Sequence, residues 1–480
     1  MTIRTILSAG TAIVLASTAH LALAQDASGV PMPGVIQSTP ATPISMKDAI
    51  GIAVSSNPEI AQAQYNKEAI QFERKQAQGL YAPRVDLEAS AGIRQLNNPA
   101  RRIAGLEHDE LYPVGGELRA EWTVIDFGRR KGELHRQAAR VDGASLRVLE
   151  RSEFVGLQVA REYLNVLLQQ RVVAASKDNV AFHEALVKDL STGVAQGSIS
   201  IADQQQAEER LQASRVRLVE AEQSLEDAKI ALRRLTGLNI DFVLEPPTLA
   251  EAMPGNEAEA IGLARTQNPL VREAEADVDA AHALANSVKA DQLPKIGVDL
   301  VGRAGHDIDA VNHGTRDIQA RVFLKWNIFD GGINKANYQE MVRRASEARY
   351  RLYDTVRRAE EDTSLAWSQL RTQTRVTGEL ETQSRVSDDL LLSYRSQFNV
   401  GRRSLLDVLD AQNSRYNTQV RLETARYSAM FARYQVLAST NRFLNAVGVA
   451  PAAGAGEKER ERFNYGPPKP AELEYRKMPN

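Results

Sequence analysis

Cysteine is absent from this chain, and that absence excludes several kinds of chemistry. A chain without cysteine has no disulfide bond, thiol nucleophile, cysteine-based metal site or lipid-modified N-terminal cysteine. Aromatic residues are scarce, at 6%, and no run of about 18 uncharged apolar residues lies beyond the N-terminal segment. The sequence therefore does not describe a helical membrane protein that crosses the bilayer repeatedly.

An excess of charge of either sign is also lacking. The chain has 59 Lys and Arg residues against 61 Asp and Glu residues, which gives a formal net charge of -2. Without a basic field, binding to nucleic acid has no electrostatic basis, and we expect no nucleic-acid partner.

The first 24 residues match a secretory signal peptide. Arg4 supplies the positive start, residues 6–23 are mostly apolar or small, and Ala22-Leu23-Ala24 is a cleavage site of the A-x-A type. We expect residues 1–24 to be removed, residues 25–44 to form an N-terminal arm, and the mature protein to be exported. Because no cysteine follows the cleavage site, we do not expect a lipoprotein.

Most of the chain consists of two similar halves. The segment AIGIA at 49–53 returns as AIGLA at 260–264, and WTVIDFG at 122–128 returns as WNIFDGG at 326–332. The copies lie about 200 residues apart, far more than the roughly 20 to 50 residues of a solenoid repeat. We infer duplication of one long unit and predict these boundaries: repeat 1 at 45–237 with a β-hairpin at 83–127, a linker at 238–255, repeat 2 at 256–448 with a β-hairpin at 294–329, and a C-terminal tail at 449–480.

Proline is missing from two long spans, between Pro113 and Pro246 and between Pro294 and Pro451. Since interior proline breaks a helix, these spans are free to be helical. We predict helices at about 46–80, 130–195, 200–236, 257–291, 333–398 and 404–446. The longest would reach roughly 90 Å, which requires parallel neighbours, as in a coiled coil or a helical barrel.

A tight turn is predicted between the two long helices of each repeat. Gly197 and Gly401 fit the glycine that ends a helix, and Ser200 and Ser404 fit the N-cap of the next one. An aspartate three residues after each serine completes a capping box.

Alternation of apolar and charged residues predicts strands at 84–93, 117–124, 295–300 and 317–328. One such strand is more typical of a soluble hairpin, but four of them beside very long helices favour tilted transmembrane strands, which need about 9 to 11 residues. Four strands cannot close a barrel, and two or three chains would supply roughly eight or twelve. The sequence leaves both oligomers open. An aromatic girdle is predicted at the strand ends from Trp122, Phe127, Trp326 and Phe329.

The repeats, the two hairpin ends and the segment FNVGRRSLLDVLD at 398–410 resemble the TolC-type outer membrane efflux and export channel family, over about 45–448. The segment AEERL at 207–211 and the helix after it are similar to members that serve type I secretion, including adhesin export. The resemblance implies a mainly α fold with a transmembrane β part. In it, a duplicated helix–hairpin–helix–helix unit forms, as a homotrimer, a twelve-stranded β-barrel in the outer membrane joined to a twelve-helix α-barrel tunnel.

The resemblance also implies partners and site residues. The partners are a periplasmic membrane-fusion adaptor, an inner-membrane ABC transporter or proton-driven pump, outer membrane lipid and an exported protein or small-molecule cargo. Asp407 and Asp410 match the aspartates that ring the periplasmic entrance, Arg403 matches the arginine that latches it, and Asp203 matches that arginine's partner in the neighbouring chain. Asp407 and Asp203 also fit plain helix-capping carboxylates. Phe398 replaces the tyrosine common in the family.

Catalysis is not indicated, because no two histidines have the spacing of a helical zinc pair and no nucleophile or phosphate-binding motif occurs. His306 and His313, with Asp307 and Asp309, fit a solvated hairpin tip better than a loose metal site. We expect neither an enzyme nor a cofactor.

Three functions stay open. We favour an exit duct for type I secretion, and the alternative is a duct for drugs or other small molecules. A periplasmic coiled-coil adaptor or scaffold without a pore is the third, although the inner-membrane anchor and lipoyl-like domain of an adaptor are not visible.

Overall fold

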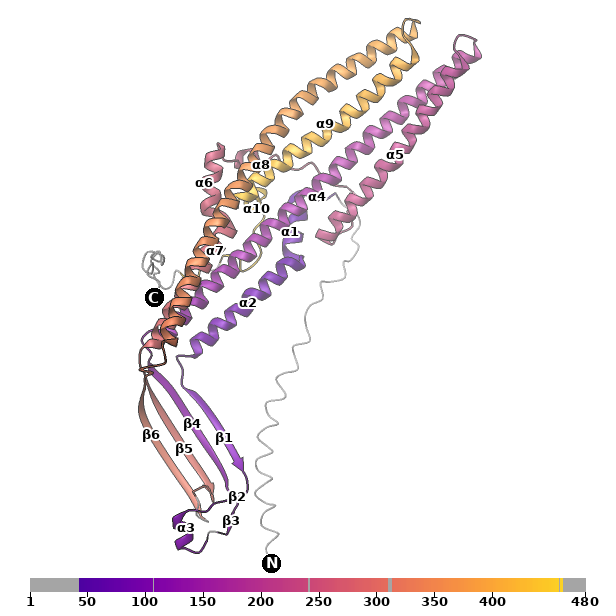
Figure 1. Ribbon diagram of the computed structural model, residues 1–480. Helices are drawn as coiled ribbons and strands as arrows, with labels where there is room; N and C mark the ends of the chain where they lie inside the picture. The colour runs from indigo at the N-terminus through magenta and orange to yellow at the C-terminus, as the bar shows by residue number, and fades with distance from the viewer. Residues whose placement is uncertain (1–42, 107, 241, 310–312, 457, 461–480) are drawn as a thin grey trace, which may run out of the picture.

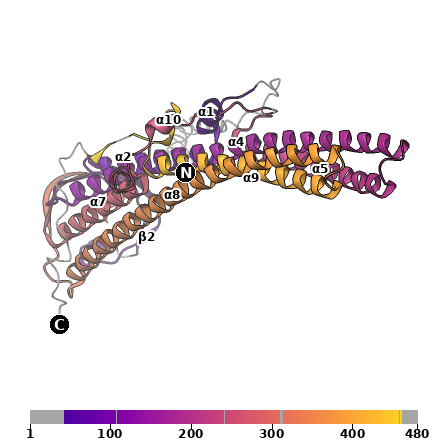
Figure 2. The same ribbon diagram turned by 90° about the horizontal axis from the view of Figure 1, so that it is seen from above.

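The computed structural model describes residues 43–460 apart from 107, 241, 310–312 and 457. The predicted signal peptide, most of the N-terminal arm and the end of the tail lie outside these residues. Two long helical hairpins lie side by side, and a small β-sheet continues from one end of them (Figures 1 and 2). The first hairpin is α4 (Arg129–Ala195) with α5 (Ile201–Thr236), and the second is α8 (Ile333–Asn399) with α9 (Leu405–Ser439).

Two of the predicted helices are in fact interrupted by an Asn-Pro pair. The predicted helix 46–80 is α1 (Met46–Ser56) followed by α2 (Pro58–Gly79), and the predicted helix 257–291 is α6 (Glu257–Gln267), α7 (Pro269–Lys289) and the short η3 (Ala290–Gln292). The asparagine before each proline caps the second helix, because its side chain accepts a backbone N–H at 2.9 Å. Proline then occupies the first helical position, where its missing N–H is not needed. The prediction of continuous helices was wrong at both places.

The predicted helix 404–446 is also divided. Its first part, α9, ends at Ser439, and α10 (Phe443–Val447) begins after a turn in which Asn441 has a φ of 56°. The backbone N–H of Arg442 donates to the carbonyl of Leu437 at 2.8 Å, which closes the turn. The short η2 (Ala250–Ala252) lies in the linker between the repeats.

The four long strands form one antiparallel sheet in the order β1-β4-β5-β6. Their bounds are β1 (Arg84–Ala91), β4 (Val114–Ile125), β5 (Lys295–His306) and β6 (Gly314–Lys325). The pairing of β4 with β5 joins the two repeats, and β1 and β6 are the edges. The connection between β1 and β4 carries β2 (Arg94–Gln95), α3 (Pro99–Ile103) and β3 (Glu110–Leu111).

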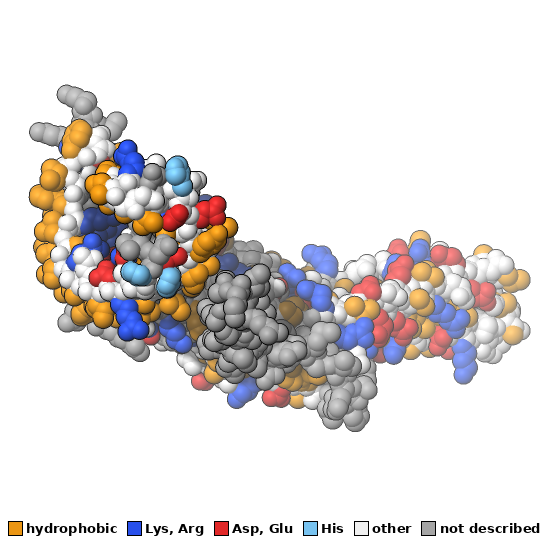
Figure 3. Space-filling model, turned by 90° about the horizontal axis from the view of Figure 1, so that it is seen from below, with side chains coloured by type: hydrophobic (Ala, Val, Ile, Leu, Met, Phe, Trp, Pro, Cys, Tyr) orange, Lys and Arg blue, Asp and Glu red, His pale blue; other side chains and the backbone are white. Residues whose placement is uncertain are grey.

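The two faces of this sheet differ in chemistry. Leu87, Ile318 and Val322 lie on one face and are 77%, 84% and 77% exposed. The other face carries charged residues, including an ion pair between Arg119 and Glu117 at 2.9 Å. Seen from its end, the curved sheet is covered by apolar side chains on its outer side, with charged side chains in the hollow (Figure 3). The sheet therefore has one apolar face and one charged face, the alternation typical of a transmembrane strand.

The largest core cluster lies where α1, α4, α5, α9 and α10 meet, around Tyr163, Tyr434 and Phe443. The hydroxyl of Tyr163 donates to the carbonyls of Ile44 and Leu244 at 2.9 and 2.7 Å. That of Tyr434 donates to the carbonyl of a linker proline at 2.5 Å. These bonds satisfy buried hydroxyl groups and hold the linker across the long helices.

Within the described part of the chain, none of the helices has both the length and the apolar character that crossing a bilayer requires.

Candidate functional site

The two helical tips, at residues 196–200 and 400–404, lie at the end of the molecule opposite the sheet (Figure 1). Gly197 and Gly401 have φ values of 73° and 71°, a left-handed conformation that glycine adopts without strain. Ser200 and Ser404 are the N-caps of α5 and α9, where their hydroxyls accept backbone N–H groups at 3.1 and 3.2 Å. The glycine and serine signals of a tight turn thus lie where they were expected. The capping box predicted at Ser200 and Asp203 is wrong, because the Ser200 hydroxyl accepts the backbone N–H of Ala202 rather than that of Asp203. The role of the tips in partner docking stays a prediction.

Asp407 and Arg403 are held together within one chain at the second tip. The hydroxyl of Ser404 donates to Oδ2 of Asp407 at 2.8 Å, so this aspartate does complete a cap. Nη1 of Arg403 lies 3.7 Å from the same oxygen, and its Nε donates to Gln397 at 3.2 Å. The guanidinium also lies over the ring of Tyr394, 4.0 Å from its centroid. These contacts position a cation at the tip.

Asp203 lies in the first turn of α5, partly buried. It forms no ion pair with the described residues of its own chain. The predicted latch joins Arg403 to Asp203 of a neighbouring chain, and it stays a prediction.

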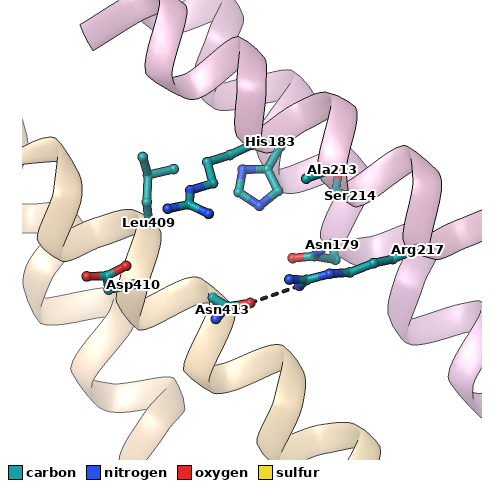
Figure 4. A pocket seen from close by; sticks show the side chains of 9 residues that line it. Asn179, His183, Ala213, Ser214, Arg217, Leu409, Asp410 and Asn413 are labelled. Atoms are coloured by element: carbon teal, nitrogen blue, oxygen red, sulfur yellow. Dashed lines mark hydrogen bonds between the residues drawn. The ribbon is translucent and has the colours of Figure 1, made fainter.

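Asp410 lies one turn beyond Asp407 and lines a pocket between the two helical hairpins (Figure 4). We call this the inter-hairpin pocket. It is lined from α4, α5 and α9 by Asn179, His183, Arg210, Ala213, Ser214, Arg217, Leu409, Asp410 and Asn413, around a cavity of about 90 Å³. The first hairpin thus contributes basic and polar groups, and the second contributes the carboxylate.

A row of polar contacts joins α4 to α9 beside this pocket. Gln412 donates to Oδ1 of Asn179 at 2.8 Å, and both side chains are buried. The hydroxyls of Ser176 and Tyr416 are 2.9 Å apart. These buried polar contacts fix the register of the two helices, although Oε1 of Gln412 has no hydrogen-bond partner among the described residues.

The sequence analysis did not predict the contacts of Asn179 with Gln412 and of Ser176 with Tyr416. Their sequence signal is a polar side chain at a helix position that faces another helix, where an apolar residue is typical. Closer to the tips the same interface is apolar, through Leu186, Leu190, Ala207, Leu405 and Leu409.

The four aromatic residues lie where the sheet meets the helices. The indole N–H of Trp122 donates to the carbonyl of Tyr81 at 3.0 Å, and that of Trp326 donates to Gln292 at 3.2 Å. Phe127 and Phe329 are 53% and 87% exposed. All four are at least 44% exposed, as a membrane girdle requires, but the girdle itself stays a prediction.

The histidine-bearing hairpin tip has its own internal contacts. Nδ1 of His306 lies 2.7 Å from Oδ1 of Asp307, and Asp309 pairs with Arg303 at 3.3 Å. No group of three or more histidine and acidic residues that could hold a metal ion occurs among the described residues.

Comparison with known proteins gives consistent matches. The sequence profile described as outer membrane efflux protein matches residues 49–238 and 260–442. The cobalt-zinc-cadmium resistance protein CzcC of Cupriavidus metallidurans is 24% identical over 428 residues, which cover 87% of this chain and 94% of that protein. Protein CyaE of Bordetella pertussis is 24% identical over 303 residues, which cover 60% of this chain but only 61% of CyaE.

Solved structures share the fold at low sequence identity. CusC superimposes with a TM-score of 0.71 at 16% identity, over 88% of this chain and 98% of CusC. The outer membrane protein VceC from Vibrio cholerae gives a TM-score of 0.69 at 16% identity, over 84% of this chain and 96% of VceC. These likenesses confirm the predicted fold class, mainly α with a transmembrane β part.

Proposed function

The chain belongs to the outer membrane efflux protein family, and we propose that it is the outer membrane duct of a tripartite export system. The observation that carries this proposal is the four-stranded sheet, which is apolar on one face, charged on the other and unpaired at both edges. An open edge is not tolerated in lipid, so further copies of the chain must close the sheet. A homotrimer would close it into a barrel of about twelve strands.

The helices supply the periplasmic part of the duct. Both α4 and α8 contain 67 residues. At 1.5 Å per residue each is about 100 Å long, enough to carry a tunnel well away from the membrane. We place the helical tips at the entrance, where a periplasmic adaptor and an inner-membrane ABC transporter or proton-driven pump would dock.

Asp407 and Asp410 are proposed to ring this entrance and to favour cations. Changing both to asparagine keeps the side-chain size and the cap, and removes the charge. We expect the double variant to lose preference for cations over anions, measured as the reversal potential in planar bilayers under a salt gradient. An unchanged reversal potential would exclude these residues as the selectivity ring.

Arg403 and Asp203 are proposed to latch the closed entrance between neighbouring chains. Arg403→Ala or Asp203→Ala should raise the single-channel conductance, because each removes one side of the ion pair. Arg402→Ala changes an exposed arginine in the same turn and is the matched control. Conductance that stays at the wild-type value in both variants would remove the latch from the proposal.

The cargo we favour is a protein, such as an adhesin, exported by type I secretion, on the similarity of 207–211 and the following helix to such members. Efflux of small solutes, including metal cations, is the second candidate. It is favoured by the nearly full-length alignment with a metal resistance protein. Deleting the gene and assaying the surface adhesin, drug sensitivity and metal sensitivity in parallel separates them.

Location is tested by fractionation. We propose that the mature protein, released from its signal peptide and without a lipid anchor, resides in the outer membrane. Detergent-stable oligomers in that fraction would exclude the pore-free scaffold. The absence of such oligomers from the outer membrane fraction would overturn the proposal of a duct.

A further inference from the structure

The inter-hairpin pocket has the charge of an anion site. Two of its lining residues, Arg210 and Arg217 on α5, carry guanidinium groups, and Asp410 is the one lining carboxylate. Asp410 forms no ion pair with either arginine within the described chain. The pocket walls therefore carry a formal charge of about +1 when the histidine is neutral.

Most N–H groups of these arginines have no protein acceptor among the described residues. Arg217 donates through Nη1 to Asn413 at 2.8 Å and lies 5.9 Å from the ring centroid of Tyr416. Arg210 has one exposed neighbour, Glu209, whose carboxylate is 3.5 Å from its Nε. Since a guanidinium has five N–H donors, each arginine keeps donors for a ligand.

His183 adds a buried group without a partner. Its side chain is 5% exposed, and its Nδ1 has no hydrogen-bond partner in the described structure. The ring lies among the side chains that line the pocket (Figure 4). Burial, together with the charges of Arg217 and Arg210, lowers the pKa of His183 to about 4. The ring is thus neutral at pH 7, and the tautomer with hydrogen on Nδ1 can donate to an acceptor.

The same groups argue against a metal ion. Two guanidinium groups repel a cation, and His183 is the one imidazole in the pocket. A cavity of about 90 Å³ holds more than one water molecule. It also has room for a small ion that accepts several hydrogen bonds.

We propose that the inter-hairpin pocket binds a small free oxyanion of the phosphate or carboxylate class, held by Arg210, Arg217 and His183. Charge-assisted hydrogen bonds from two guanidinium groups supply the affinity. All three groups belong to the first helical hairpin, on α4 and α5, and Leu409, Asp410 and Asn413 of α9 close the pocket opposite them. The inference does not depend on the duct, since binding is measured on the purified protein.

The test is calorimetric titration of the full-length protein in detergent with inorganic phosphate, and separately with citrate, at constant ionic strength set by sodium chloride. We expect saturable binding, with Arg210→Gln and Arg217→Gln each weakening it about tenfold or more. Arg215→Gln is the control, because Arg215 lies on the same helix but pairs with exposed Glu184 at 2.8 Å. The control should bind as the wild type does.

A second measurement covers variants that fold poorly. Phosphate should raise the unfolding temperature of the wild-type protein above its value in chloride of equal ionic strength, since a ligand of the folded state stabilises it. Absence of both saturable binding and this shift in the wild type overturns the proposal. If Arg215→Gln weakens binding as much as Arg210→Gln and Arg217→Gln do, the binding comes from general surface charge, and the proposal is overturned too.

Discussion

Replacing Glu153 on α4 with glutamine is expected to stabilise the protein at neutral and alkaline pH but not at acidic pH. Glu153 is 6% exposed and accepts the backbone N–H of Leu444, at the start of α10, at 3.3 Å. Burial raises the pKa of Glu153 to about 8, although the Leu444 bond opposes the shift. The folded protein therefore retains a proton that the unfolded chain releases near pH 4.5.

The size of the effect follows from the difference between the pKa of Glu153 in the unfolded chain, 4.5, and in the folded protein, about 8. Below about pH 4.5 the carboxyl is protonated in both states, so Glu153 does not lower the free energy of unfolding. As the pH rises toward 8 the stability falls by about 1.4 kcal/mol per unit, which amounts to about 3 kcal/mol at pH 7 and about 5 kcal/mol in full. Glutamine still accepts the Leu444 N–H and has no proton to lose.

The assay is denaturant unfolding of the purified protein, followed by far-ultraviolet circular dichroism between pH 5 and pH 8. We expect the midpoints of wild type and Glu153→Gln to be close near pH 5 and to separate as the pH rises. The midpoint of the variant should still fall somewhat as the pH rises, because burial also raises the pKa of Glu273 to about 7. Glu220→Gln, on an exposed position of α5, is the control. Parallel curves for wild type and Glu153→Gln would show that Glu153 does not carry this titration.

Two further outcomes follow from packing and from the tail. Gly132→Ala should destabilise the protein by about 1 to 3 kcal/mol in the same unfolding assay, because its Cβ would lie 2.7 Å from the backbone of Ser287 on α7. Gly143→Ala, whose Cβ would lie no closer than 3.6 Å to any neighbour, should have no such cost, and equal losses would refute the packing argument. Asp142→Asn should speed trypsin cleavage at Arg460 about tenfold, because buried Asp142 accepts the Arg460 N–H and Nε at 3.1 and 2.9 Å. A rate equal to that of the wild type would mean that these bonds do not hold the tail.

Local signals predicted the secondary structure well where the physical cause is local. Long spans without proline became helices of 67 residues, and period-two alternation became strands. The Asn-Pro pairs were the exception. Pro58 is compatible both with the interior of a kinked helix and with the start of a new one, and the choice depends on packing against α4.

The residues of the site were less predictable, because several of them are brought together by tertiary packing. Ser404 and Asp407 could be assigned from their spacing, since the cap closes within one turn. Asn179 and Gln412 meet only because two hairpins more than 200 residues apart in sequence lie together. Pairings of that kind are set by tertiary packing, which a single sequence does not display.

The open edges of the sheet have a genetic consequence. Strands β1 and β6 are edges without a further partner strand in the described part of the chain, so a duct closed by additional copies would combine the products of every allele expressed in the cell. With equal amounts of intact and edge-defective chains, about one trimer in eight would contain intact chains alone. A mutation that disrupts β1 or β6 while leaving the rest of the chain folded should therefore be dominant, whereas complete loss of one gene copy should be recessive.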